Sequence, residues 1–317
     1  MRNFISLLQN ENMKLSHRIS TWVMYAILLA IILFGALITI FFNDSIRQDL
    51  GDDWKTTLQE ENEEYQTVME EDEFFGEMYA MDIAINNYHL ENDLKPLPYD
   101  AWQFTMDNVG LSSIISLFTI IVAAGIVASE YRLGTIKLLL IRPISRAKIL
   151  LSKYITVLIF SLVMLIFLFV SSMLVGLIFF GINGMNPSVV QMGANGPEEI
   201  NLFSEIFTQF GLSMVNLLMM ATFAFMISSL FRNSGMAIGV SIFLMFTGNT
   251  IVSVLAEYDW AKYILFANTN LQQYIGSGTP IIDGMTLGFS ISILAIYYII
   301  FIAVSWLSFT KRDIAGT

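Results

Sequence analysis

The sequence predicts an all-α, polytopic membrane protein with six transmembrane helices. Of its 317 residues, 55% are hydrophobic and 14% are charged. Six apolar runs approach the ~20 residues that a helix needs to cross ~30 Å of hydrocarbon, and none of them contains Asp, Glu, Lys, Arg or His. These runs cannot share one soluble core, because too little polar surface would remain to cover them. The whole chain, 1–317, is therefore expected to form a single transmembrane domain.

The expected spans follow the apolar runs. They are Thr21–Phe42, Val109–Ser129, Tyr154–Ile182, Ile206–Phe231, Gly235–Leu255 and Thr286–Phe309. The basic start of the chain resembles that of a secretory signal, but the first apolar run is longer than a signal core. The first span is therefore expected to remain as an uncleaved anchor.

The segment 1–20 ahead of the first span is amphipathic. Its apolar positions are Phe4, Ile5, Leu7, Leu8 and Leu15, with polar Gln9, Asn10, Glu11 and Asn12 between them. This pattern favours an elbow helix along the inner membrane surface. A disordered basic leader is the alternative.

The loop 43–108 after the first span is too long and too patterned to be a simple connection. It holds 18 acidic and three basic residues. Apolar residues recur at helical spacing, namely Trp54, Leu58, Tyr65, Val68, Phe75 and Tyr79. The pattern predicts outer helices ending near Pro96 and Pro98. The acidic side is either a solvated face or a surface that attracts a cationic peptide.

The charge of the connectors alternates along the chain and predicts its orientation. The segments 1–20, 130–153, 232–233 and 311–317 hold 12 of the 16 basic residues, whereas 43–108, 183–205 and 256–284 hold 24 of the 27 acidic residues. Lys and Arg near span ends favour the cytoplasmic side. Both termini and the 130–153 connector are therefore expected in the cytoplasm, with Arg146, Lys148 and Lys153 at the membrane surface.

The connector 130–153 is expected to contain a short helix. Gly134 permits a sharp turn after Glu130, and Thr135 can cap a helix over Ile136–Ile141. Pro143 ends it, and Ser145 is placed to cap the next helix. The short helix either lies in the lipid headgroups or docks into a groove on a cytoplasmic partner as a coupling helix.

The motif EYRLGTIKLLLIRPISRAKILLSKY at 130–154 resembles the connector after the second span in permease subunits of ABC-2 type transporters. NENMKL at 10–15, NYHLENDLKP at 87–96 and the order of the six spans are also similar to this family, especially to its Gram-positive bacterial members. The resemblance covers most of the chain. It implies an exporter in the bacterial cell membrane and a re-entrant segment at 256–284 that dips back from outside.

The resemblance also implies a site and partners. The residues implied to form or shape the contact with an ATPase subunit are Glu130, Gly134, Thr135, Leu138, Leu139, Pro143, Ser145 and Arg146. The implied partners are that cytoplasmic ABC ATPase, a second permease and membrane lipid, without nucleic acid. ATP and Mg²⁺ would be bound by the ATPase, with no cofactor or metal held by this chain.

The energy source separates the possible functions. The chain contains no G-x-x-x-x-G-K-[ST] motif, so we expect a transport subunit without an ATPase site of its own. Ion-coupled carriers usually keep ionisable residues within their spans, where none is found here. An ATP-independent carrier or channel remains the first alternative, and a membrane immunity or sensing protein that binds a cationic peptide remains the second. Polar span residues expected to line a path are Ser112, Ser113, Ser116, Asn216, Ser228, Ser229, Asn249 and Thr250.

Overall fold

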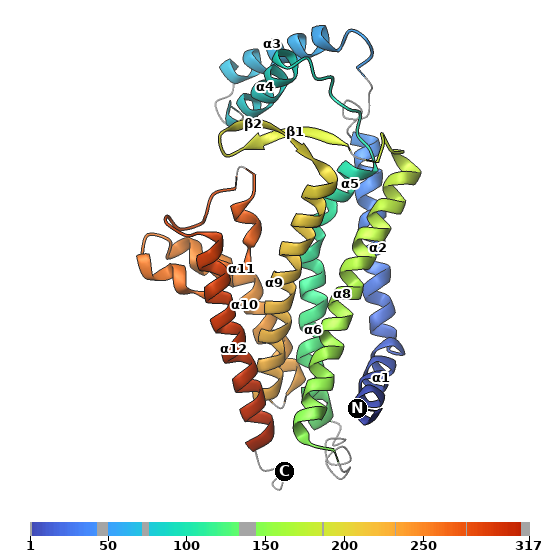
Figure 1. The fold of residues 1–317 in the computed structure, drawn as a ribbon, viewed down its shortest axis with the longest axis vertical. Helices are drawn as coiled ribbons and strands as arrows, with labels where there is room; N and C mark the ends of the chain where they lie inside the picture. The colour runs from blue at the N-terminus through green and yellow to red at the C-terminus, as the bar shows by residue number, and fades with distance from the viewer. Residues whose placement is uncertain are drawn as a thin grey trace.

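The computed structural model describes residues 2–42, 50–71, 76–132, 144–185, 187–231, 233–276 and 278–311. The long helices run side by side in one bundle, with a smaller helical cap at one end (Figure 1). The long helices are α2 (Ile19–Phe42), α6 (Ser112–Arg132), α8 (Arg146–Phe179), α9 (Leu202–Leu230), α10 (Ser234–Val254) and α12 (Leu287–Lys311). The shorter elements are α1 (Arg2–Ser16), α3 (Trp54–Glu71), α4 (Gly76–Glu91), α5 (Ala101–Asp107), η3 (Asn108–Leu111), β1 (Ser188–Gly193), β2 (Gly196–Asn201), η4 (Asp259–Tyr263), α11 (Leu265–Thr269) and η5 (Leu271–Tyr274).

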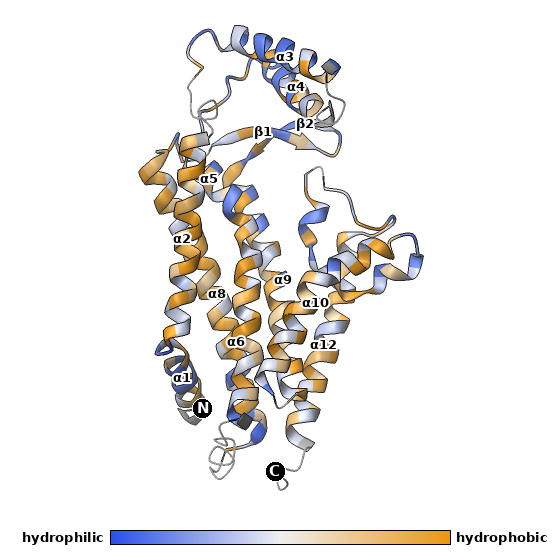
Figure 2. Ribbon diagram, turned by 180° about the vertical axis from the view of Figure 1, so that it is seen from behind, coloured by the Kyte–Doolittle hydropathy of each residue, from blue (hydrophilic) through white to orange (hydrophobic). Residues whose placement is uncertain are grey.

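In the part of the chain that the structure describes, six helical segments are long and apolar enough to cross a membrane, as the sequence predicts. Both ends of the described chain lie at one end of the bundle, and α3 and α4 lie at the other (Figure 1). Apolar residues dominate the bundle and polar residues dominate α3 and α4 (Figure 2). The fold is therefore that of a multi-pass membrane protein. We name the end with the termini the inner end and the capped end the outer end, after the predicted orientation, which stays a prediction.

The second span begins earlier than predicted. Its helical path starts at Ala101 instead of Val109, and runs through α5 and η3 into α6. Asp100 explains the start: its side chain accepts hydrogen bonds from the backbone of Trp102 and Gln103, and Gln103 bonds back to the Asp100 N–H. This reciprocal capping box satisfies the free donors of the first turn. The predicted outer loop 43–108 therefore ends before this helix.

The third span is the continuation of a helix that begins where the sequence predicts. Helix α8 starts at Arg146, directly after Ser145, and runs through the predicted span start at Tyr154; it is 34 residues long, about 51 Å at ~1.5 Å per residue. Ser145 occupies the predicted N-cap position, and its backbone carbonyl accepts from Lys148 and Ile149, but its side chain makes no capping hydrogen bond. As a result Lys153 lies in the interior of the helix.

Helices α6 and α9 form the centre of the bundle. They are the most buried of the six spans, whereas α2, α10 and α12 are the least buried. The Ser228 hydroxyl on α9 donates to the Ala124 carbonyl at 2.6 Å and accepts from the Ala128 N–H at 3.1 Å. The Ala124 carbonyl and the Ala128 N–H are four residues apart, the spacing of a backbone hydrogen bond within a helix. The Ser228 hydroxyl bonds to both groups and so links the backbone of α6 to α9.

We call α3, α4, β1, β2 and the described residues that connect them to α2 and α5 the outer cap. Its two strands show that the all-α prediction was wrong for this part of the chain. β1 and β2 form an antiparallel hairpin with Gly193 opposite Gly196, and α4 packs against both strands. Ala194 and Asn195 form the two-residue turn, and Gly196 directly after it has a positive φ of 121°, which glycine adopts readily. The pair of strands was missed because the prediction followed apolar runs and helical spacing, which this short polar segment does not have.

Two helices, α3 and α4, lie in the segment after the first span where apolar residues recur at helical spacing. Trp54 and Leu58 are buried, and the rings of Tyr65 and Tyr79 stack with centroids 5.0 Å apart. Asn62 bonds to Asn86 and Asn87 between the two helices. Helix α4 ends at Glu91, five residues before the predicted stop at Pro96.

The segment 256–284 folds into η4, α11 and η5 at the outer ends of α10 and α12. Asn268 is fully buried there, where its amide donates to two backbone carbonyls and its Oδ1 accepts from Ser290. These bonds fix the short helices on α12. Re-entry of this segment into the membrane stays a prediction.

Gly176 controls how closely α8 and α5 approach each other. A Cβ atom at this position would lie 2.8 Å from the Ala101 Cα, which is too close for two non-bonded carbon atoms. Because Ala101 Cα is a backbone atom, the contact could be relieved only by moving one of the two helices. We expect Gly176→Ala to destabilise the protein by about 1–3 kcal/mol through overpacking. The loss is measured as a lower thermal unfolding midpoint in detergent.

Gly35→Ala is the matched control, because Gly35 lies in α2 with open space at its Cβ position. We expect this control to be neutral or slightly stabilising, since alanine favours a helix more than glycine does. Equal midpoints for the two variants would contradict the close packing of α8 on α5.

Candidate functional site

A cluster of four charged side chains joins three helices at the inner end of the bundle. We call Glu11, Lys14, Glu130 and Lys153 the inner charge cluster. Lys153 Nζ lies 2.7 Å from Glu11 Oε2 and 3.0 Å from Glu130 Oε1. Lys14 Nζ lies 3.0 Å from Glu11 Oε1 and 3.4 Å from Glu130 Oε1. Two cations and two anions therefore alternate, with no net formal charge.

Lys153 is the most buried member of the inner charge cluster. Its side chain is 1% exposed, compared with 6% for Glu11 and 12% for Glu130. A buried ammonium carries a desolvation penalty of several kcal/mol, which is offset only when its hydrogen bonds are well made. The two carboxylates at 2.7 and 3.0 Å supply those bonds. Lys153 thus holds α1 and α6 to α8.

Lys14 closes the cluster on the solvent side. Its side chain is partly exposed and contacts both carboxylates. Burial lowers the pKa of Lys14, but hydrogen bonding to Glu11 and the charges of Glu11 and Glu130 outweigh it, so the pKa lies above its ordinary value. Lys14 consequently remains a cation at neutral pH and balances the second carboxylate charge.

The structure places three of the predicted site residues. Glu130 ends the second span as expected, but it points onto α1 and α8. Arg146 donates to the Thr310 carbonyl at 3.3 Å, in the last turn of α12. A cation there complements the negative end of the helix dipole. Ser145 lies at the start of α8. The predicted helix 136–141 and the other site residues, Gly134, Thr135, Leu138, Leu139 and Pro143, lie outside the described residues.

Sequence reasoning missed the partners of Glu130. Glu11 was assigned to the polar face of the elbow helix, and Lys153 to the membrane surface, but both are buried. The available signals were weak: Glu11 and Lys14 are three residues apart on one helix, and Lys153 directly precedes an apolar run. Glu11 and Lys153 are 142 positions apart in the sequence. Their pairing depends on how the helices pack, so no local sequence pattern predicts it.

The inner charge cluster ties the connector to the bundle. Residues Glu130 and Lys153 stand on opposite sides of the segment 131–152, and their 3.0 Å ion pair fixes the end of α6 to the first turns of α8. Glu11 fixes α1 to the same point. A force applied to this connector would therefore move α1, α6 and α8 together.

A second candidate site is a pocket of about 270 Å³ toward the outer end of the bundle. We call it the polar pocket. It is lined from α6, α9, α10 and the segment 256–284 by Gly110, Ser112, Ser113, Ser116, Asn216, Met220, Met245, Phe246, Asn249, Phe266, Thr269, Asn270 and Gln272. Five of the eight span residues predicted to line a path meet here. Of the others, Ser228 bonds to α6 and Ser229 to Met226 and Ser308.

Asn216 gives the polar pocket an unused acceptor. Its Oδ1 is buried and has no hydrogen-bond partner among the described residues. A buried polar atom without a partner costs free energy, which a bound group with N–H or O–H donors would recover. The lining mixes amides and hydroxyls with Met and Phe side chains and holds no charged residue. It suits a neutral or amphiphilic solute.

The family is shown by comparison with known sequences. A family model described as a protein of unknown function (DUF2705) matches residues 78–315. The chain belongs to this family. The DUF2705 match contains the whole polar pocket together with Glu130 and Lys153, and begins after Glu11 and Lys14.

Two relatives from Bacillus subtilis (strain 168) extend the comparison. The uncharacterized protein YhcI is 43% identical over 316 residues, covering 98% of this DUF2705 chain and 100% of the relative. The uncharacterized membrane protein YdbK is 38% identical over 206 residues, covering 64% of this chain and 79% of the relative. The description of YdbK agrees with the six spanning-length helices found here.

Removing one partner of the inner charge cluster should be costly. We expect Lys153→Met to destabilise the protein by about 3–5 kcal/mol, because it removes the buried cation that contacts both Glu11 and Glu130. The double variant Glu11→Gln, Lys153→Met should lose clearly less than the sum of the two single losses, since it removes a charge of each sign. Chemical unfolding in detergent measures all three variants.

Lys55→Met is the matched control for a lysine ion pair. Lys55 pairs with Asp93 in the outer cap, where the two side chains are 51% and 76% exposed. An exposed pair contributes about 0–1 kcal/mol. Equal losses for Lys55→Met and Lys153→Met, or strictly additive losses in the double variant, would contradict the role given to the inner charge cluster.

Proposed function

We propose that this chain is the permease subunit of an ATP-driven ABC-2 type exporter in the bacterial cell membrane. In this proposal it pairs with a second permease, identical or related, and with cytoplasmic ATPase subunits that bind ATP and Mg²⁺. The chain forms the translocation path and hydrolyses no ATP itself. Both termini and the 130–153 connector lie in the cytoplasm, and α3, α4 and the hairpin lie outside.

The observation that best supports the proposal is the ion pair between Glu130 and Lys153. A subunit that is moved by a separate ATPase needs a rigid link between the surface that contacts the ATPase and the helices that move. The pair joins both sides of the connector, and Glu11 adds α1 to the same joint. ATP binding would draw the ATPases together and shift this joint as one body.

The polar pocket supports a transport role for the spans. It lies between α6, α9 and α10, and its amide and hydroxyl groups sit among apolar side chains at the outer end of the bundle. An exporter needs such a weakly polar surface where a solute leaves the bundle. A neutral or amphiphilic substrate is consistent with this lining.

Recovery of an ATPase tests the proposal. We expect the solubilised protein to co-purify with a cytoplasmic ABC ATPase from its native cells. The double substitution Leu138→Asp, Leu139→Asp should reduce this recovery at least tenfold, because it places two charges on the predicted docking face. Quantitative mass spectrometry of the purified complex measures the ratio of the two subunits.

Leu97→Asp serves as the matched control, since Leu97 is an exposed leucine in the outer cap. It should leave the recovery unchanged. Full biological activity in cells that lack every candidate ATPase would contradict the proposal and favour a carrier or channel. Binding of a cationic peptide without transport would favour an immunity or sensing protein.

The absence of cysteine allows a direct test of orientation. We expect a membrane-impermeant thiol reagent to label Asp52→Cys in intact cells, and to label His17→Cys only after the membrane is opened. Both positions are exposed, Asp52 in the outer cap and His17 between α1 and α2. Labelling of His17→Cys in intact cells would reverse the proposed orientation.

A further inference from the structure

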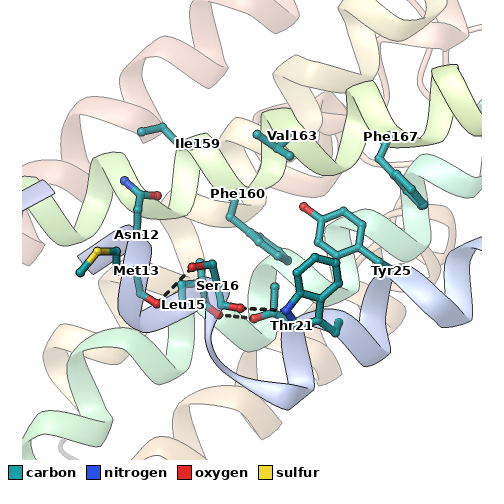
Figure 3. A pocket seen from close by; sticks show the side chains of 11 residues that line it. Asn12, Met13, Leu15, Ser16, Thr21, Tyr25, Ile159, Phe160, Val163 and Phe167 are labelled. Atoms are coloured by element: carbon teal, nitrogen blue, oxygen red, sulfur yellow. Dashed lines mark hydrogen bonds between the residues drawn. The ribbon is translucent and has the colours of Figure 1, made fainter. Parts of the chain in front are cut away.

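The largest cavity described lies beside the inner charge cluster, between α1, α2 and α8. Its volume is about 530 Å³. Figure 3 shows the lining side chains converging from the three helices. They are Asn12, Met13, Leu15, Ser16, Thr21, Trp22, Tyr25, Ile159, Phe160, Val163 and Phe167. We call this cavity the inner groove.

Four polar side chains that line the inner groove donate hydrogen bonds within the chain. Thr21 donates to the Leu15 carbonyl, Trp22 Nε1 donates to the Ser16 carbonyl, and Ser16 donates to the Met13 carbonyl. These bonds are drawn in Figure 3. Asn12 likewise donates to Leu8. The surface left for an occupant is mostly apolar, so the occupant is held by packing and not by hydrogen bonds.

The groove has the length of one acyl chain in one leaflet. On α8 it extends from Ile159 to Phe167, eight residues or about 12 Å at ~1.5 Å per residue. Half of a ~30 Å hydrocarbon layer is about 15 Å. Trp22 and Tyr25 stand near the start of α2, where aromatic rings favour the level of the headgroups. An open apolar groove at this depth faces hydrocarbon and fills with it.

The two-residue turn between α1 and α2 carries an exposed cation, Arg18. Arg18 is not a lining residue itself, but Ser16, Thr21 and Trp22, on either side of the turn, line the groove. An arginine at this level attracts the phosphate of an anionic lipid. The apolar lining and the length of the groove match a lipid acyl chain, and the nearby cation matches an anionic headgroup. Together they favour a phospholipid as the occupant.

We propose that the inner groove binds one phospholipid of the inner leaflet, with an acyl chain against Phe160 and Val163 and an anionic headgroup at Arg18. The lipid completes the wall between α1, α2 and α8, and it touches the elbow helix that Glu11 attaches to Lys153. This inference rests on the orientation given under the proposed function, which the cysteine labelling tests separately, but not on the transport role, because it concerns a resident lipid and not a transported solute.

Native mass spectrometry tests this site. The protein is purified from nanodiscs of equimolar phosphatidylglycerol and phosphatidylethanolamine, and the lipid retained after detergent exchange is counted. We expect one phospholipid per chain, mostly phosphatidylglycerol. Val163→Trp, which fills the groove, should reduce retention about tenfold. Arg18→Gln should retain a lipid but lose the preference for phosphatidylglycerol.

Leu174→Trp is the matched control, because Leu174 is an exposed residue of α8 outside the groove. It should retain the lipid like the wild type. Equal retention by Val163→Trp and the wild type would overturn the proposal. So would a change in the number of chains per complex with unchanged lipid, since that result would assign the groove to contacts between copies.

A second measurement detects the lipid through the fluorescence of Trp22, which lines the groove. In nanodiscs containing phosphatidylglycerol with brominated acyl chains, bromine near Trp22 quenches its fluorescence. The contribution of Trp22 is the difference between wild type and Trp22→Phe. We expect stronger quenching of this contribution by brominated phosphatidylglycerol than by brominated phosphatidylethanolamine. Equal quenching by both lipids would overturn the assignment of the headgroup to Arg18.

Discussion

The inner end of this protein depends on one buried ammonium group. Lys153 is held between Glu11 and Glu130, and no single helix contains both of its partners. The free energy needed to remove its charge from water is offset only when α1, α6 and α8 are all in place. The arrangement therefore favours one packing of three helices over the many that their apolar surfaces alone would permit.

Much of the fold could be predicted from the sequence, because it follows from hydropathy and local chemistry. The six spans are continuous apolar runs, whereas the amphipathic α1 and the segment of the outer cap have apolar residues at helical spacing. The start of α5 was placed late, because the prediction of the spans followed apolar runs. Asp100 caps this helix within polar sequence, and there the cap decides the boundary.

The candidate site was less accessible to the same reasoning. Glu130 was recognised, but its partners Glu11 and Lys153 are distant in the sequence and looked like surface residues. The polar pocket was partly anticipated, since Ser112, Asn216 and Asn249 do meet, yet their meeting point depends on how α6, α9 and α10 pack. Contacts between helices in hydrocarbon arise from shape and small residues, which leave weak traces in one sequence.

Helix α8 connects the two ends of the molecule without a proline in its 34 residues. Lys153 anchors it near one end, and Gly176 fits against Ala101 near the other. Such a rod pivots more readily than it bends. Tilting it by about 5° around its inner end would carry the outer end sideways by about 4 Å over its ~51 Å length. A small displacement at one membrane face would thus be magnified at the opposite face.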